Sequence, residues 1–231
     1  AQQNDGRVSA FLAAWVPALI MAEGWAVSPV WESVRRQTEA RLQTDLAKLR
    51  HDLAMGQAPT GAIEGDVLDL GVFPDGVAAR ARHHDLTVVG CAGADSQRAL
   101  IEAALFPTGR PVMLAPPRWT PREIGRNIVI AWKATREAAR ALAEAADLIA
   151  KANRVTILRV DTDQTRDDCQ AAGGEIAAHL TRRGVTAHSC VVAPLGRSEA
   201  RSVLDHAQAI DADLIVMGGF GRSRMSEFVF G

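Results

Sequence analysis

The sequence predicts an α/β protein with two similar domains, each an open, mainly parallel β-sheet flanked by helices. In the second half of the chain, β-branched apolar runs alternate with helical patterns, which is typical of βαβ units. Two segments of the first half, 7–12 (RVSAFL) and 85–90 (DLTVVG), have counterparts in the same order at 154–159 (RVTILR) and 213–218 (DLIVMG). The proline-rich stretch 115–122 separates the two copies.

Composition and charge limit the class of protein. The 231 residues are 48% hydrophobic and 23% charged, which suffices for a substantial core. With 26 Lys and Arg against 27 Asp and Glu, the formal net charge is −1, so there is no broad cationic field for nucleic acid or acidic lipid. The longest apolar stretch, 11–21, is too short to span a bilayer and only Arg7 precedes it as a cation. We therefore expect a cytoplasmic protein without a membrane span.

Several catalytic and metal-binding motifs are missing from the sequence. Cys91, Cys169 and Cys190 are far apart and form no CxxC pair, so neither a disulfide framework nor a zinc site is expected. The chain contains no GxSxG, P-loop or HExxH motif. Hydrolase, classical NTPase and zinc-protease functions therefore lack support, and no catalytic or metal-ligating residue is assigned.

The expected elements of the second half follow one another closely. The expected strands are 127–132, 154–160, 185–192 and 214–217. Thr135 and Ser198 each begin a helix, because their side-chain oxygens can accept hydrogen bonds from backbone amides of the first turn. Gly184 ends the helix between them. The uninterrupted apolar run 214–217 is typical of a strand that is buried on both faces.

The first copy lacks counterparts to the first elements of the second. In the second copy, Ile128 precedes Val155 by 27 positions, whereas Val8, the counterpart of Val155, is almost the first residue of the chain. A closing strand is expected at 110–115, with no counterpart before Gly231. We therefore expect that the first strand of domain 1 and the last strand of domain 2 are absent from this chain.

A domain boundary is expected near Trp119, which gives domains 1–118 and 119–231. The first domain carries an insertion that begins at Ser28–Pro29 and continues to Leu53 as a long amphipathic pattern. Its charged residues form a mixed, solvated face. We expect a helix whose apolar side packs on the sheet.

The strongest functional signal is a glycine motif directly after the last strand. Gly218, Gly221 and Gly231 have the spacing Gly-x2-Gly-x9-Gly, and Arg222 and Ser223 lie within it. Glycines let the backbone approach a ligand closely, and amides at a helix N-terminus favour phosphate oxygens. Arg222 and Ser223 add hydrogen-bond donors. The glycines at 218 and 221 alone are equally compatible with a tight strand-to-helix turn.

The segment 211–231 (DADLIVMGGFGRSRMSEFVFG) resembles the closing ATP-binding segment of the universal stress protein family. The family's pattern continues with Ser or Thr after the third glycine, a position that would follow Gly231. The resemblance covers 124–231 as one family domain and 1–116 more weakly, which implies the tandem type. It implies a Rossmann-like fold of five parallel strands in each domain. In the ATP-binding branch, it also implies an adenine nucleotide between the end of the first strand and the glycine loop.

The resemblance assigns roles by position. The implied phosphate contacts are Gly218, Gly221, Arg222 and Gly231. Ala131 and Trp132 would end the first strand near the base and ribose. Val160 would form a wall of the adenine pocket, and Val192 is a further candidate for that wall.

Lys133 departs from the family pattern, which usually has Asp after the first strand. A lysine there could pair directly with a phosphate, which would suit a nucleotide with little dependence on Mg²⁺. It could equally be a solvated loop lysine.

The first copy departs further from the pattern. It keeps Gly90 and Gly93 as the first pair of glycines, but Ala103 stands where the third should be. We interpret its phosphate site as degenerate and the first copy as a structural partner of the second.

Two hypotheses of function follow. The first is a tandem universal stress protein that binds ATP, or AMP or ADP, in its C-terminal domain and acts as a nucleotide-dependent stress-response or signalling module. It would hydrolyse ATP slowly at most, because no general base is evident. The alternative is a nucleotide-free scaffold that engages a protein partner. The resemblance also implies pairing of the two domains within the chain, or a homodimer.

Overall fold

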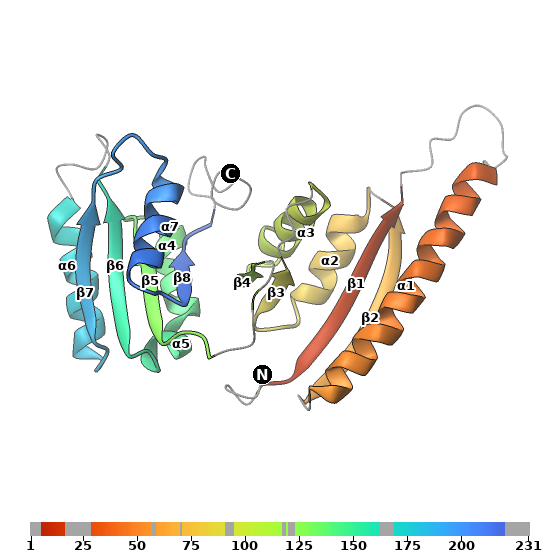
Figure 1. The fold of residues 1–231 in the computed structure, drawn as a ribbon, viewed down its shortest axis with the longest axis horizontal. Coiled ribbons are helices and arrows are strands. Elements are labelled where there is room, and N and C mark those ends of the chain that lie inside the picture. Colours follow the sequence, from red (N-terminus) through yellow and green to blue (C-terminus); the bar gives the residue numbers. More distant parts are fainter. Residues whose placement is uncertain are drawn as a thin grey trace. The chain divides into compact units, whose positions relative to one another are not determined.

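The structure is a computed structural model. It describes residues 6–16, 29–56, 59–69, 71–90, 95–116, 119, 123–161 and 169–219. Contacts along the chain divide it into two compact units, Ala1–Trp119 (unit 1) and Thr120–Gly231 (unit 2). Both units combine helices with parallel strands (Figure 1).

The described part of unit 2 contains one parallel sheet of four strands in the order β7-β6-β5-β8. The strands are β5 (Asn127–Ala131), β6 (Arg154–Val160), β7 (Ala187–Val192) and β8 (Leu214–Met217). The central strand β5 pairs with β6 along one edge and with β8 along the other. Ala131, at its carboxyl end, lies opposite both Leu158 and Met217. The strands agree with the sequence prediction, except that β5 ends at Ala131 and β7 begins at Ala187.

The helices described in unit 2 are α4 (Arg136–Glu144), α5 (Ala146–Ala150), α6 (Cys169–Arg182) and α7 (Glu199–Ala209). Two of them, α4 and α7, begin where the sequence predicts. Thr135 accepts a hydrogen bond from the Ala138 amide at 3.3 Å, and Ser198 accepts one from the Arg201 amide at 3.2 Å. The pattern after Thr135 predicts one helix, but α4 and α5 meet at Ala145. The Ala145 amide still donates to the Ala141 carbonyl, so the apolar face continues across the break.

Two apolar clusters cover the two faces of this sheet. One packs the sheet against α4, α5 and α6 and includes Ile128, Ile130, Val155, Ile157 and Val216. The other packs it against α7 and includes Val129, Leu158, Val203 and Ala207. Side chains along a strand alternate between faces, so β5 contributes to both clusters. Burial on both faces explains why the β5 sequence is an uninterrupted apolar run.

Asp213 fixes the starts of β5 and β8 to each other. Its carboxylate accepts hydrogen bonds from the backbone amides of Gly125 and Arg126, each at 3.0 Å, and of Asn127 at 3.2 Å. Three amides that point at one carboxylate form charge-assisted hydrogen bonds. The polar residue before the apolar run of β8 therefore has a structural role at the amino end of the sheet.

In unit 1, the described strands form two separate parallel pairs rather than one sheet. Its elements are β1 (Val8–Val16), α1 (Pro29–Met55), β2 (Thr60–Asp69), α2 (Phe73–Ala81), β3 (Thr87–Gly90), α3 (Asp95–Leu105) and β4 (Val112–Ala115). β1 pairs with β2, and β3 pairs with β4. The sequence predicts a single sheet in this domain. In the structure, the strands form two pairs instead, because no described strand pairs with both β1 and β3.

Helices cover both faces of the β1–β2 pair. The long helix α1 packs on one face through Leu42 and Leu46, which confirms the predicted helix with an apolar side on the sheet. On the other face, Phe11 and Ala13 of β1 pack with the cluster that α2 and α3 form. No helix in the described residues is long and apolar enough to cross a membrane.

We expect Asp213→Asn to lower the free energy of unfolding by about 2 kcal/mol, because an amide NH₂ would replace one of the acceptor oxygens that face three backbone amides. Asp211→Asn is the matched control. Asp211 has a φ of 52°, a backbone conformation that Asn adopts as readily as Asp, so its free energy of unfolding should stay within about 0.5 kcal/mol. Urea denaturation measures both. Equal effects of the two substitutions would contradict the anchoring role of Asp213.

Candidate functional site

The winding of the unit 2 sheet reverses between β5 and β8. The chain runs from β5 to β6 and β7 in one direction, then returns through α7 to place β8 on the opposite edge of β5. All four arrows of this sheet point to the same end in Figure 1. Ligands of open parallel sheets bind in the crevice beyond the carboxyl ends of the strands where the order reverses. The candidate site therefore lies beyond Ala131 and Met217, which the register places opposite each other.

Three of the predicted site residues share one face of the sheet at this end. Ala131, Val160 and Val192 end β5, β6 and β7, and all three pack against the apolar cluster under α7. Each is partly buried. The structure thus brings together, on one face, the residues that the family resemblance places around an adenine base.

The side chain of Trp132 lies on the opposite face. It is 8% exposed and belongs to the cluster that contains Ile130 and Ala138, beside α4. Its backbone amide donates to the Leu158 carbonyl at 2.8 Å. Its indole Nε1 has no hydrogen-bond partner among the described residues. A ligand on the Ala131 side would therefore meet the backbone of Trp132 rather than its ring.

Gly218 follows β8 and passes very close to the first turn of α4. A Cβ atom built at this position would lie 2.5 Å from the backbone nitrogen of Ala138 and 2.7 Å from the carbonyl carbon of Glu137. Real Cβ atoms do not approach backbone so closely, so this contact requires glycine whether or not a ligand binds. The other predicted phosphate contacts, Gly221, Arg222, Ser223 and Gly231, lie outside the described residues.

Lys133 is ion-paired. Its Nζ lies 2.5 Å from the Oε2 atom of Glu199, the first residue of α7. The Lys133 side chain is 57% exposed, and exposed ion pairs contribute about 0 to 1 kcal/mol. A phosphate group could therefore compete with Glu199 for this ammonium group at little cost. The sequence allows two alternatives for the Lys133 side chain, a pair with a phosphate group or full solvation. The ion pair with Glu199 belongs to neither of them.

Other charged groups at this edge also occur in pairs. Arg136 Nε donates to Glu137 Oε1 at 2.6 Å in the first turn of α4. This hydrogen bond raises the pKa of Arg136 and lowers the pKa of Glu137. Near the start of α7, Arg197 and Arg201 both pair with Asp205. Among the described residues, no cluster of His, Cys, Asp and Glu could hold a metal ion.

Comparison with known proteins agrees with this geometry. The profile of the Universal stress protein family matches residues 125–231. These residues form a universal stress protein domain. No curated protein matches the chain in sequence.

Solved structures resemble the chain in fold. A universal stress protein from Archaeoglobus fulgidus DSM 4304 covers 96% of this chain and 89% of its own, with a TM-score of 0.64 and 12% identity. Protein Rv1636 from Mycobacterium tuberculosis H37Rv covers 44% of this chain and 76% of its own, with 19% identity and a TM-score of 0.31. The first likeness shows a shared α/β fold with parallel strands, and the second is too distant to show one.

Sequence reasoning misses two partners in the universal stress protein domain. Glu199 follows the helix cap Ser198, but nothing in its local sequence indicates a pair with Lys133, from which 66 positions separate it. The contact of Gly218 with Ala138 joins residues that are 80 positions apart in the sequence. The only local signal is the small side chain of Ala138 in the first turn of α4, and it is too common to identify a contact.

We expect Gly218→Ala to lower the free energy of unfolding of this domain by about 2 kcal/mol, because the added methyl group would displace the α4 backbone. The control is Gly174→Ala in α6. A Cβ at Gly174 meets nothing within 4 Å, so alanine should raise the free energy of unfolding by about 0.5 to 1 kcal/mol. Denaturant titration monitored by circular dichroism distinguishes the two signs. If Gly218→Ala leaves the free energy of unfolding unchanged, Gly218 does not pack tightly against the α4 backbone in solution.

Proposed function

We propose that the universal stress protein domain binds an adenine nucleotide, ATP or else AMP or ADP, beyond the carboxyl ends of β5 and β8. One observation carries this proposal. The reversal of the sheet between β5 and β8 puts the segment after Ala131 and the segment that begins with Gly218 at the same edge. These are the two segments that the glycine motif and the resemblance single out for nucleotide contact.

Each group would have a distinct role in binding. Ala131, Val160 and Val192 present apolar surface on one face, where a flat base would lie against the strand ends. The backbone from Gly218 onward would supply amides to the phosphates, together with the Arg222 guanidinium. Lys133 would exchange its exposed contact with Glu199 for a phosphate oxygen. Binding of this kind needs no catalytic group, and we propose a nucleotide-dependent stress-response module that turns ATP over slowly at most.

A titration of the 231-residue chain with ATP, followed by isothermal calorimetry, tests the proposal. We expect saturable binding to one site. Gly221→Asp should weaken it at least about tenfold, because a carboxylate would face the phosphates within the predicted loop. Gly174→Asp is the control, since it adds the same charge on the exposed surface of α6, at a glycine whose Cβ would meet nothing within 4 Å. Absence of saturable binding by the unsubstituted chain, or equal weakening by both substitutions, would contradict nucleotide binding.

Two observations favour the second candidate function, a nucleotide-free scaffold that binds a protein partner. Lys133 is already neutralised by Glu199, and the packing of Gly218 on α4 explains that glycine without any ligand. Under this alternative, the same calorimetric titration yields no heat of ATP binding, and ATP leaves the free energy of unfolding of the chain unchanged. The titration therefore separates the two functions.

A further inference from the structure

The ion pair between Lys133 and Glu199 positions a carboxylate beside the end of β5. The Nζ atom of the lysine lies 2.5 Å from the Oε2 atom of the glutamate. The lysine backbone is fixed by Thr135, whose amide donates to the Lys133 carbonyl at 2.8 Å. Glu199 is fixed by the cap Ser198, which begins α7. Because α7 packs on the face of the sheet that contains Ala131, the carboxylate belongs to the same face.

The Glu199 carboxylate can bind a further group. Among the described residues, its hydrogen-bond partner is Lys133, which contacts one of the two oxygens. An ionised carboxylate has about four acceptor sites, so most of its capacity is left. The side chain is 26% exposed, which gives a solute access to it.

The other acidic side chains that the structure describes near this edge are less suitable. Glu137 is bound to Arg136, and Asp205 is bound to two arginines of its own surroundings. Asp161 follows Val160 directly, and its amide continues the strand ladder by a 2.8 Å hydrogen bond to the Val192 carbonyl. Since side chains along a strand alternate, the Asp161 side chain lies on the face opposite to Val160 and away from α7.

The ribose of a bound nucleotide would lie over the end of β5. This step rests on the proposed function, in which the base lies against the ends of β5, β6 and β7 and the phosphates lie over the backbone from Gly218. β5 pairs with β6 on the base side and with β8 on the phosphate side. The sugar joins the base to the phosphates, so it crosses the segment directly after Ala131, where Lys133 and Glu199 meet.

We propose that Glu199 binds the ribose hydroxyl groups and makes the site specific for nucleotides that carry both a 2′- and a 3′-hydroxyl. The two hydroxyls donate to the carboxylate, while the Lys133 ammonium group moves to a phosphate oxygen. An acidic side chain binds the ribose 2′-hydroxyl in dinucleotide-binding α/β folds by the same chemistry. Lys133 stands where the family usually has Asp, and in this chain α7 returns a carboxylate to that place from 66 positions away.

Calorimetric titration of the 231-residue chain with ATP and with 2′-deoxy-ATP tests the proposal. We expect 2′-deoxy-ATP to bind at least about tenfold more weakly, because a hydrogen bond to a charged acceptor is lost. If ATP itself shows no saturable binding, both this proposal and nucleotide binding are overturned. If the two nucleotides bind saturably and equally, this proposal alone is overturned.

Substitution of Glu199 assigns the discrimination to this side chain. In Glu199→Ala, ATP and 2′-deoxy-ATP should bind about equally. The substitution also frees Lys133 for the phosphates, but that effect is the same for both nucleotides and cancels in the ratio of their dissociation constants. Glu199→Gln keeps the size of the side chain and should lower the preference for ATP as well, because a neutral amide is a weaker acceptor.

Glu144→Ala is the matched control. Glu144 ends α4, is 30% exposed and pairs with Arg140 at 2.9 Å, so the control breaks a comparable ion pair outside the site. It should leave the preference for ATP unchanged. The circular dichroism spectrum establishes that each variant is folded. A folded Glu199→Ala variant that binds both nucleotides more tightly, with the preference unchanged, would overturn the proposal, because Glu199 would then only compete with phosphate for Lys133.

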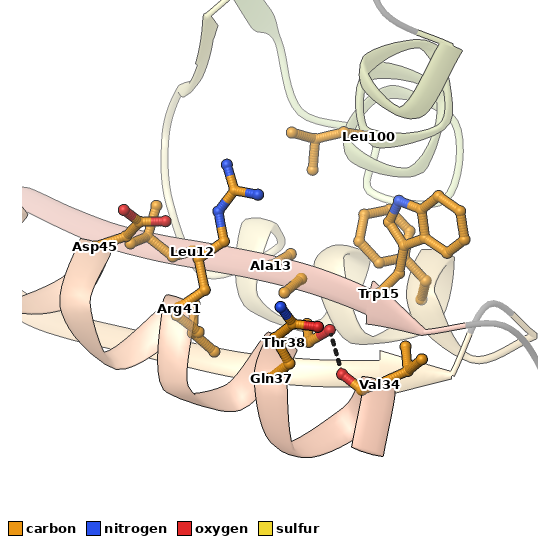
Figure 2. Close-up of a pocket in the computed structure, with 12 residues that line it drawn as sticks. Leu12, Ala13, Trp15, Val34, Gln37, Thr38, Arg41, Asp45 and Leu100 are labelled. Carbon is orange, nitrogen blue, oxygen red and sulfur yellow. Dashed lines mark hydrogen bonds between the residues drawn. The ribbon is translucent and has the colours of Figure 1, made fainter. Parts of the chain in front are cut away.

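A cavity in unit 1 is the rival place for a nucleotide. It has a volume of about 700 Å³ and lies beside β1. Trp15 of β1 and Arg41 and Asp45 of α1 lie around it (Figure 2). This set also combines an aromatic ring, a guanidinium group and a carboxylate. A preference for ATP that survives Glu199→Ala and is lost in Asp45→Ala would place the nucleotide in unit 1 and overturn the proposal.

Discussion

The pairing of β5 along both of its edges is the interaction on which the structure of the universal stress protein domain depends. Ile128 and Val129 are fully buried, and Ile130 is 2% exposed, so the strand contributes to the core on both faces of the sheet. A strand in this position cannot leave backbone amides and carbonyls unpaired without a large cost in free energy. β6 and β8 satisfy these groups, and Asp213 holds the β5 and β8 starts together. Every candidate site residue that the structure describes is attached to this sheet or to the loops directly after it.

The same constraint gives unit 1 a different form. Its β1 and β3 strands correspond in sequence to the two neighbours of β5, but the described residues contain no strand between them. The four strands consequently form two pairs on a shared layer of helices, and side chains such as Val88 are exposed. Among the described residues, unit 2 thus has β5 between the counterparts of β1 and β3, whereas no strand of unit 1 pairs with both β1 and β3.

Local sequence patterns predict the parts of the fold that depend on local physics. The apolar runs of β5, β6 and β8 are long enough to identify buried strands, and the oxygens of Thr135 and Ser198 identify two helix starts. The patterns predict neither β2 nor α2. β2 contains two glycines and three acidic residues, and α2 has a proline and a glycine in its first turn, so neither carries a clear apolar period.

The candidate site was predictable to the extent that it follows from strand ends. Ala131, Val160 and Val192 share a face because the register places Ala131 opposite Leu158, two positions before Val160, and Val160 opposite Val192. The Glu199 partner of Lys133 and the packing of Gly218 on α4 were not predictable, because both join residues far apart in the chain. Both contacts depend on how α4 and α7 are placed against the sheet, which no local pattern specifies.

The account places a nucleotide at the edge where the sheet reverses, and backbone amide NMR of the ¹⁵N-labelled chain tests that placement most directly. Addition of ATP should shift the amide signals of residues 131–133 and of Gly218 and Gly219 more than those of the opposite, amino-terminal edge around Asn127 and Asp213. Shifts that are absent, or that are largest at the amino-terminal edge or in unit 1, would contradict the account.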